Sequence, residues 1–164
     1  MADLLGGNVE PRLKDRVWDL WKRFACGLDV EEPDFGYENK KQIKFVALNA
    51  YGENDGSGKE KRTIETIHET TVTNAFLNSG GNLHGGCAAF LIDVFVQLCD
   101  AVAVRTRRQY GSIEAPLGTP LRIISTSVSA GGRVSTVRSE IWDTKRDKLV
   151  ASGVHLKMQA RARL

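Results

Sequence analysis

The chain has 164 residues, enough for one domain with a substantial core, and a second full domain is not expected. Its 23 basic and 20 acidic residues give a net charge of +3, which is too balanced for a nucleic-acid-binding surface. The three cysteines, Cys26, Cys87 and Cys99, lack the spacing of disulfide or metal-binding pairs, and no secretory signal is evident near the start. We therefore expect reduced thiols, no metal site and a cytoplasmic protein, with a mitochondrial address left open.

The first 41 residues are predicted to form an amphipathic helix and a linker. Apolar residues recur with a helical period between Pro11 and Cys26, with proline at the entry and Gly27 at the exit. Residues 28–41 are acidic and then basic, without a periodic pattern. We interpret them as a surface connection to the rest of the chain.

Residues 42–160 contain five β-prone runs and one long apolar segment. The runs are rich in Val, Ile and Thr and cover residues 42–51, 62–73, 121–130, 133–142 and 149–159. Glycine-rich or polar turns separate consecutive runs, which favours antiparallel pairing. Two runs precede the apolar segment and three follow it. This order predicts an α+β fold in which an antiparallel sheet wraps around one central helix.

The apolar segment from Gly86 to Val104 has nearly the length of a membrane span. It includes Asp93 and Asp100, however, and each aspartate costs roughly 3 kcal/mol at the centre of a membrane helix. We therefore predict a buried helix of a globular domain and no membrane span. A carboxylate in such a helix is costly unless it is paired or used, so Asp93 is a candidate active-site residue.

The loop before this helix offers further polar groups. Gly85 and Gly86 are predicted to start the helix, where backbone amides lack internal acceptors and the helix dipole is positive, so a developing oxyanion fits there. His84 precedes these amides, and Asn78 lies six residues before His84. Both side chains are expected to bring hydrogen bonds to the same pocket.

The separation along the helix constrains how such a site works. Gly85 and Asp93 are eight residues apart, or roughly 12 Å of helix rise, which is too far for both to act on one group within one chain. Two antiparallel central helices across a two-fold axis would bring each Asp93 beside the Gly85 of the other chain. We therefore predict at least a homodimer, with a homotetramer also open.

The Asn, His-Gly-Gly and Asp pattern between Asn78 and Asp93 resembles the hotdog-fold acyl-CoA thioesterases of the phenylacetate-pathway and thioesterase superfamily member 2 type. The resemblance covers about residues 43–159. It implies cofactor-free hydrolysis of a fatty or aryl acyl-CoA to free acid and coenzyme A. By the same resemblance, Asp93 is the general base or the direct nucleophile, and the backbone of Gly85 binds the thioester oxygen. Asn78 and His84 orient the water and the thioester.

The resemblance also indicates where coenzyme A binds. Its phosphates are expected beside the loop formed by residues 129–134 and beside the last strand at Lys157. The loop residues are Ser129, Ala130, Gly131, Gly132, Arg133 and Val134.

One part of the family pattern differs in this chain. The family has a full strand after the helix, beginning with a Ser or Thr of the active site, but residues 105–115 show no β pattern. Ser112 lies near the expected distance from His84, yet Pro116 follows it by only four residues. We therefore predict that this strand is missing or shortened. The alternative function is a catalytically silent hotdog module that binds acyl-CoA or a protein; enoyl-CoA hydration ranks below both.

Overall fold

The computed structural model describes residues 5–26, 35–54, 60–99, 105–109, 113–130 and 134–158. Its helices are α1 (Pro11–Cys26), α2 (Tyr37–Lys40), the 3-10 turn η2 (Asn74–Phe76) and α3 (Gly85–Cys99). Its strands are β1 (Lys44–Asn54), β2 (Glu60–Thr71), β3 (Arg105–Gln109), β4 (Pro120–Ala130), β5 (Val134–Asp143) and β6 (Lys148–Met158). The predicted N-terminal helix is confirmed as α1, and the predicted helix start at Gly85 is confirmed as the start of α3.

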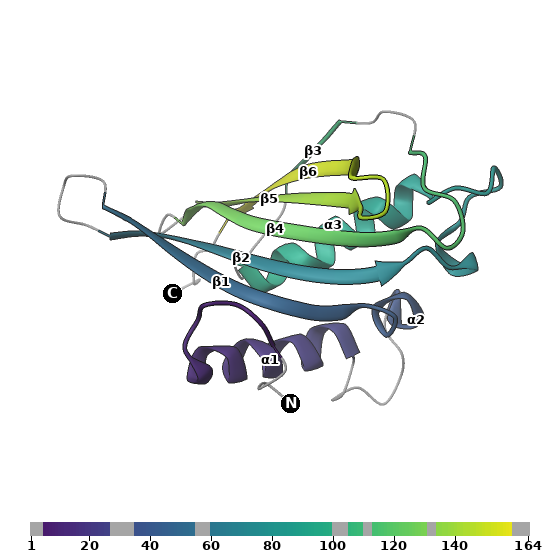
Figure 1. The fold of residues 1–164 in the computed structure, drawn as a ribbon. Coiled ribbons are helices and arrows are strands. Elements are labelled where there is room, and N and C mark those ends of the chain that lie inside the picture. Colours follow the sequence, from purple (N-terminus) through teal and green to yellow (C-terminus); the bar gives the residue numbers. More distant parts are fainter. Residues whose placement is uncertain are drawn as a thin grey trace, which may run out of the picture.

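The strands form a single antiparallel sheet in the order β1-β2-β4-β5-β6-β3. The sheet curves over α3, as Figure 1 shows. This arrangement confirms the predicted α+β fold with a sheet wrapped around one helix. In the β5-β6 turn of the meander, the carboxylate of Asp143 accepts hydrogen bonds from the backbone amides of Lys145 and Arg146 of 2.9 and 3.1 Å.

The strand after α3 is present but short. Residues 105–109 form β3, which pairs with β6 from Arg105 opposite Leu156 to Gln109 opposite Ser152. A strand is therefore present after α3, and its shortening relative to the family pattern stays a prediction. The sequence Arg-Thr-Arg-Arg-Gln shows no alternation of apolar and polar residues because an edge strand is held by backbone hydrogen bonds to one neighbour.

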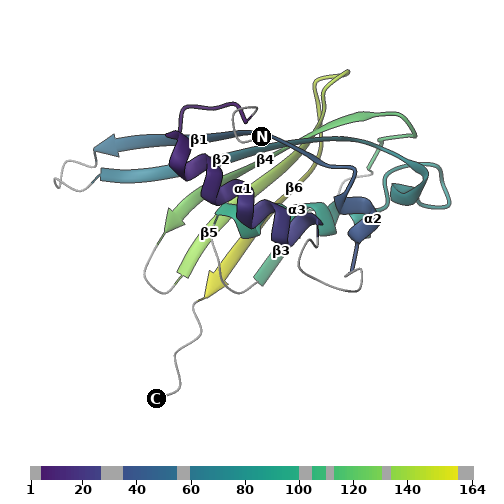
Figure 2. The ribbon, with the colours of Figure 1, turned by 90° about the horizontal axis from the view of Figure 1, so that it is seen from below.

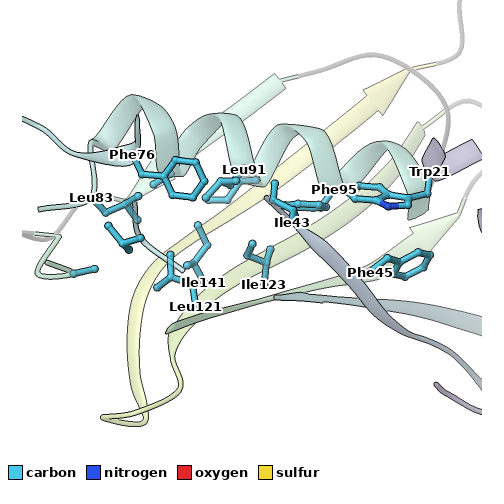
Figure 3. Packing of buried hydrophobic residues seen from close by; sticks show 14 of the residues in the cluster. Trp21, Ile43, Phe45, Phe76, Leu83, Leu91, Phe95, Leu121, Ile123 and Ile141 are labelled. Atoms are coloured by element: carbon cyan, nitrogen blue, oxygen red, sulfur yellow. The ribbon is translucent and has the colours of Figure 1, made fainter. Parts of the chain in front are cut away.

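Helix α3 supplies the centre of the core. Its buried residues Ala88, Leu91, Ile92 and Phe95 recur at three- and four-residue spacing and face the sheet. They pack against inward-facing residues of β4 and β5, including Leu121, Ile123 and Ile141 (Figure 3). Within the described residues, no helix combines the length and hydropathy needed to cross a membrane.

Helix α1 lies on the same side of the sheet as α3 (Figure 2). Trp21 of α1 is 3% exposed and stacks on Phe95 of α3 with ring centroids 5.6 Å apart. Trp18 stacks on Phe45 of β1 with centroids 6.2 Å apart. The apolar face of α1 therefore extends the core beyond the C-terminal half of α3.

The segment before α1 covers the free edge of β1. Gly6 pairs with this edge through backbone hydrogen bonds to Val46 and from Leu48 of 2.8 and 3.2 Å. The side-chain amide of Asn8 then bonds both backbone groups of Ala50, as a neighbouring strand would. This pairing satisfies part of an edge that would otherwise be open to another strand.

His68 of β2 is enclosed by aromatic rings. It is fully buried, and its ring lies 4.1 Å from Phe95, 4.6 Å from Phe45 and 5.0 Å from Trp21, between centroids. Neither ring nitrogen forms a hydrogen bond with the described residues. Burial therefore holds the pKa of His68 well below 6.5, and the ring is neutral in the folded protein.

The environment of His68 predicts a pH-dependent stability. The unfolded chain takes up a proton near pH 6.5, whereas folded His68 does not, so the unfolding free energy should fall below this pH. The contribution of this group is up to about 1.4 kcal/mol per pH unit. Urea denaturation of wild type and His68→Phe between pH 7 and pH 5 measures it, because phenylalanine keeps the ring contacts and cannot be protonated. Equal pH dependence of the two proteins would contradict this interpretation.

Candidate active site

A compact loop holds His84 at the start of α3. The backbone N–H of Asn78 donates a 2.8 Å hydrogen bond to the carbonyl of Asn82. The side-chain oxygen of Asn78 accepts hydrogen bonds from the amides of Gly80 and Asn82 at 2.9 and 3.2 Å. Gly81 has a φ of 76°, which favours glycine at this turn. The Asn78 oxygen thus organises its own loop.

His84 caps α3 with its side chain. The amide of Gly86 donates a 2.9 Å hydrogen bond to Nδ1 of His84, so Nδ1 is unprotonated and a neutral ring carries its proton on Nε2. A Cβ at Gly86 would lie 2.9 Å from Nδ1 and 3.1 Å from Cε1 of the same ring. The second glycine of the His-Gly-Gly motif therefore gives the histidine ring room to fold back over the helix.

The amide of Gly85 is left for an external acceptor. It belongs to the first turn of α3, where backbone N–H groups have no acceptor within the helix. No described residue accepts its hydrogen bond. The helix dipole adds a positive potential at the same place. Nearby Cys87 is partly buried, and burial raises the pKa of its thiol to about 11, so it remains protonated at neutral pH. The site therefore offers a hydrogen-bond donor at the helix start without a thiolate beside it.

Asp93 lies two turns further along α3, beside β6. Its Oδ1 atom is 3.6 Å from Nδ1 of His155, whose side chain is 2% exposed. The Asp93 side chain itself is 46% exposed, so the expectation of a buried carboxylate is wrong for the single chain. The reason is that the sheet covers only the stripe containing Leu91, Ile92 and Phe95, and Asp93 lies at the border of that stripe.

The contact between Asp93 and His155 depends on a glycine in β6. A Cβ at Gly153 would lie 3.1 Å from Cγ2 of Ile92, so even a methyl group there would require Ile92 to shift by a few tenths of an ångström. Gly153 and His155 are two residues apart and face the same side of the sheet. Sequence reasoning assigned no role to His155. The available signal was this glycine, which marks a close helix–strand approach two positions before a histidine.

The structure does not bring all the predicted residues together in one chain. His84 and Gly85 lie at the start of α3, and Asn78 lies in the loop before it, where its side-chain oxygen bonds Gly80 and Asn82. Asp93 is separated from Gly85 by about 12 Å of uninterrupted helix. Ser112 lies outside the described residues. The chain therefore presents two separate groups of candidate residues, one at each end of a two-turn stretch of helix.

The predicted coenzyme A residues converge at one end of the β4-β5-β6 meander. The register places Ala130 opposite Ser135 and Ser135 opposite Lys157, while Ser129 and Val134 are exposed. The pairing thus places Lys157 of the last strand at the same end of the sheet as Ala130 and Ser135, although Lys157 is more than twenty residues from both in sequence. Gly131, Gly132 and Arg133 lie outside the described residues.

Comparisons with solved structures identify the fold. Zebrafish thioesterase superfamily member 2 superposes with a TM-score of 0.63 and 18% identity over 89% of this chain and 97% of that chain. The mouse thioesterase superfamily member 2 has a TM-score of 0.54 and 25% identity over 58% of this chain and 81% of that chain. A hypothetical thioesterase of Streptococcus pneumoniae, solved with coenzyme A, has a TM-score of 0.54 and 20% identity over 60% of this chain and 81% of that chain.

The chain therefore has the hotdog fold of these thioesterase structures, and the predicted resemblance is confirmed. No protein-family model matches the chain, and no curated protein matches its sequence.

The two glycines of the motif are expected to respond differently to alanine. Gly86→Ala places a methyl group against the His84 ring and breaks the capping hydrogen bond. Among the described residues, a Cβ at Gly85 meets only Ile113, at 3.9 Å. Since alanine favours helix equally at both positions, Gly86→Ala should be about 1 kcal/mol less stable than Gly85→Ala. Urea denaturation of the two variants measures this difference. Equal stability would show that the cap is dispensable.

Proposed function

We propose that the protein is an acyl-CoA thioesterase that hydrolyses a fatty or aryl acyl-CoA to free acid and coenzyme A. The observation that supports this most directly is the Gly85 amide, which has no acceptor among the described residues. It lies beside a histidine cap on a helix that also carries a half-exposed carboxylate. Acyl transfer needs both an oxyanion donor and a base or nucleophile. The hotdog fold, shared with thioesterase structures, favours the same chemistry.

In this proposal, the Gly85 amide binds the thioester oxygen and stabilises the negative charge that develops there. Asp93 accepts a proton from the attacking water, or attacks the thioester carbon itself and forms an anhydride that water then opens. The tetrahedral intermediate collapses with cleavage of the carbon–sulfur bond, and coenzyme A leaves as the thiolate and takes up a proton. The Nε2–H group of His84 and the amide of Asn78 orient the substrate.

The proposed site combines two subunits. The helix rise between Gly85 and Asp93 separates the amide from the carboxylate within one chain, so a second chain supplies the missing half. A partner at this position would also cover the Asp93 side of α3, which the single sheet leaves open. We propose a homodimer as the smallest active form.

Loss of the Asp93 carboxylate should abolish thiol release. Asp93→Asn is expected to lower kcat by at least about a hundredfold with medium- or long-chain acyl-CoA, because it removes the base or nucleophile. Free-thiol detection measures turnover, and light scattering after gel filtration checks the oligomer. Asp15→Asn, at an exposed aspartate of α1, is the matched control and should retain wild-type activity. Full activity of Asp93→Asn would contradict the role of Asp93 as the base or nucleophile.

Subunit mixing tests the shared site directly. Gly85→Pro removes the amide hydrogen at the first helical position, where proline is tolerated, and Gly85→Ala controls for the added bulk. Gly85→Pro and Asp93→Asn should each be inactive alone. After co-refolding in equal amounts, half of the dimers are mixed and each contains one intact composite site, so about a quarter of wild-type activity should return. No recovery from verified mixed dimers would place both groups in one subunit.

The short β3 supports a second candidate function, a silent hotdog module that binds acyl-CoA or a protein partner. β3 has five residues on the edge of the sheet next to β6, the strand that carries His155. A wild-type protein that binds coenzyme A without releasing thiol from any acyl-CoA tested would favour this candidate.

A further inference from the structure

We propose that His155 is a positioning residue that orients the carboxylate of Asp93 for reaction. This inference rests on the proposed thioesterase function and adds a residue for which the sequence motif provides no indication. It is carried by the 3.6 Å approach of His155 Nδ1 to Asp93 Oδ1 and by the opposite exposure of the two side chains.

The difference in exposure shows on which side of the Asp93 carboxylate the His155 ring lies. The His155 side chain is 2% exposed and approaches Asp93 from the sheet, whereas the Asp93 side chain is 46% exposed. The imidazole therefore lies on the buried side of the carboxylate, and substrate reaches it from the open side. Oδ1 faces His155, which leaves Oδ2 to act on water or on the thioester carbon.

The packing around His155 keeps its ring in place. On β5 it lies opposite Val137, which is fully buried, and the backbone register of β6 with β3 protects its other edge. Gly153, on the same face of β6, lets Ile92 approach closely and so brings the next residue, Asp93, over the ring. Strand β6 thus presents the buried imidazole to a half-exposed carboxylate. This is the arrangement in which a third group orients a catalytic base or nucleophile.

The chemistry of the pair fits that role. With its proton on Nδ1, His155 becomes a donor toward Oδ1, and hydrogen bonds to an ionised acceptor are shorter and stronger than neutral ones. Contacts of this kind are often long in free enzymes and close when substrate is bound. The contact restricts rotation of the carboxylate and so holds Oδ2 in the reactive direction.

His68 provides a matched comparison within the same sheet. It is also a fully buried histidine on an inward-facing strand position, but its neighbours are the aromatic rings of Trp21, Phe45 and Phe95. His68→Leu is therefore the control for loss of a buried imidazole as such. It should lower stability and leave kcat near the wild-type value.

The test compares His155→Leu and His155→Asn with wild type in a thiol-release assay. Removing a partner that orients a working group typically costs about tenfold to a hundredfold, as at metal sites. His155→Leu should therefore lower kcat by about that factor with KM within about twofold of wild type. Asn places an amide nitrogen near the position of Nδ1, so His155→Asn should recover part of the loss. Unchanged kcat, or equal kcat for the two variants, would overturn the proposal.

A double-mutant cycle separates positioning from general destabilisation. If His155 acts through Asp93, His155→Leu should lower the residual single-turnover rate of Asp93→Asn by less than about twofold. A loss that multiplies with the Asp93→Asn loss would overturn the proposal.

Wild type, the two single variants Asp93→Asn and His155→Leu, and their double variant also distinguish this inference from the proposed function. If wild type releases no thiol, the proposed function fails. The contact between Asp93 and His155 can then still be tested by measuring the free energy of unfolding in urea. Losses of stability that are less than additive for Asp93→Asn and His155→Leu would support the contact, and additive losses would refute it.

Discussion

The close packing of α3 against β6 is the constraint on which the candidate site depends. A Cβ at position 153 would lie 3.1 Å from Cγ2 of Ile92, so glycine there favours the close approach of helix and strand. On the same part of the helix, Oδ1 of Asp93 lies 3.6 Å from Nδ1 of His155. The buried stripe of α3 fixes the rotation of the helix, because Leu91 and Phe95 must face the sheet. With both rotation and distance set by packing, the carboxylate has one place to lie.

The same helix separates the chemical groups that it carries. Its first turn supplies an amide donor at Gly85 and a histidine cap, whereas its third turn carries the carboxylate. A straight helix cannot bring its own first and third turns together, so its geometry favours a site completed by a second copy. The dimensions of the α-helix thus set the oligomeric state that we propose.

The N-terminal region stabilises the opposite end of the core. Helix α1 inserts Trp21 between elements of the main fold, and the segment before it satisfies part of the β1 edge through Gly6 and Asn8. The aromatic cluster around His68 joins α1, β1, β2 and α3. A neutral histidine in this cluster makes the attachment of α1 sensitive to acid, at a distance in sequence from the candidate catalytic residues.

Local sequence determined helices α1 and α3, five of the six described strands and the Asn78–Asp93 motif, because hydrophobic periodicity and helix-start signals involve neighbouring residues. The short helix α2 (Tyr37–Lys40) lies in the predicted surface connection and was not expected. Residues 105–109 were not predicted as a strand, since an edge strand depends on its partner more than on its own pattern. The tertiary structure alone decided that Asp93 is half-exposed and that His155 lies beside it. These two residues are 62 positions apart, and only strand register and helix packing, which are non-local, bring them together.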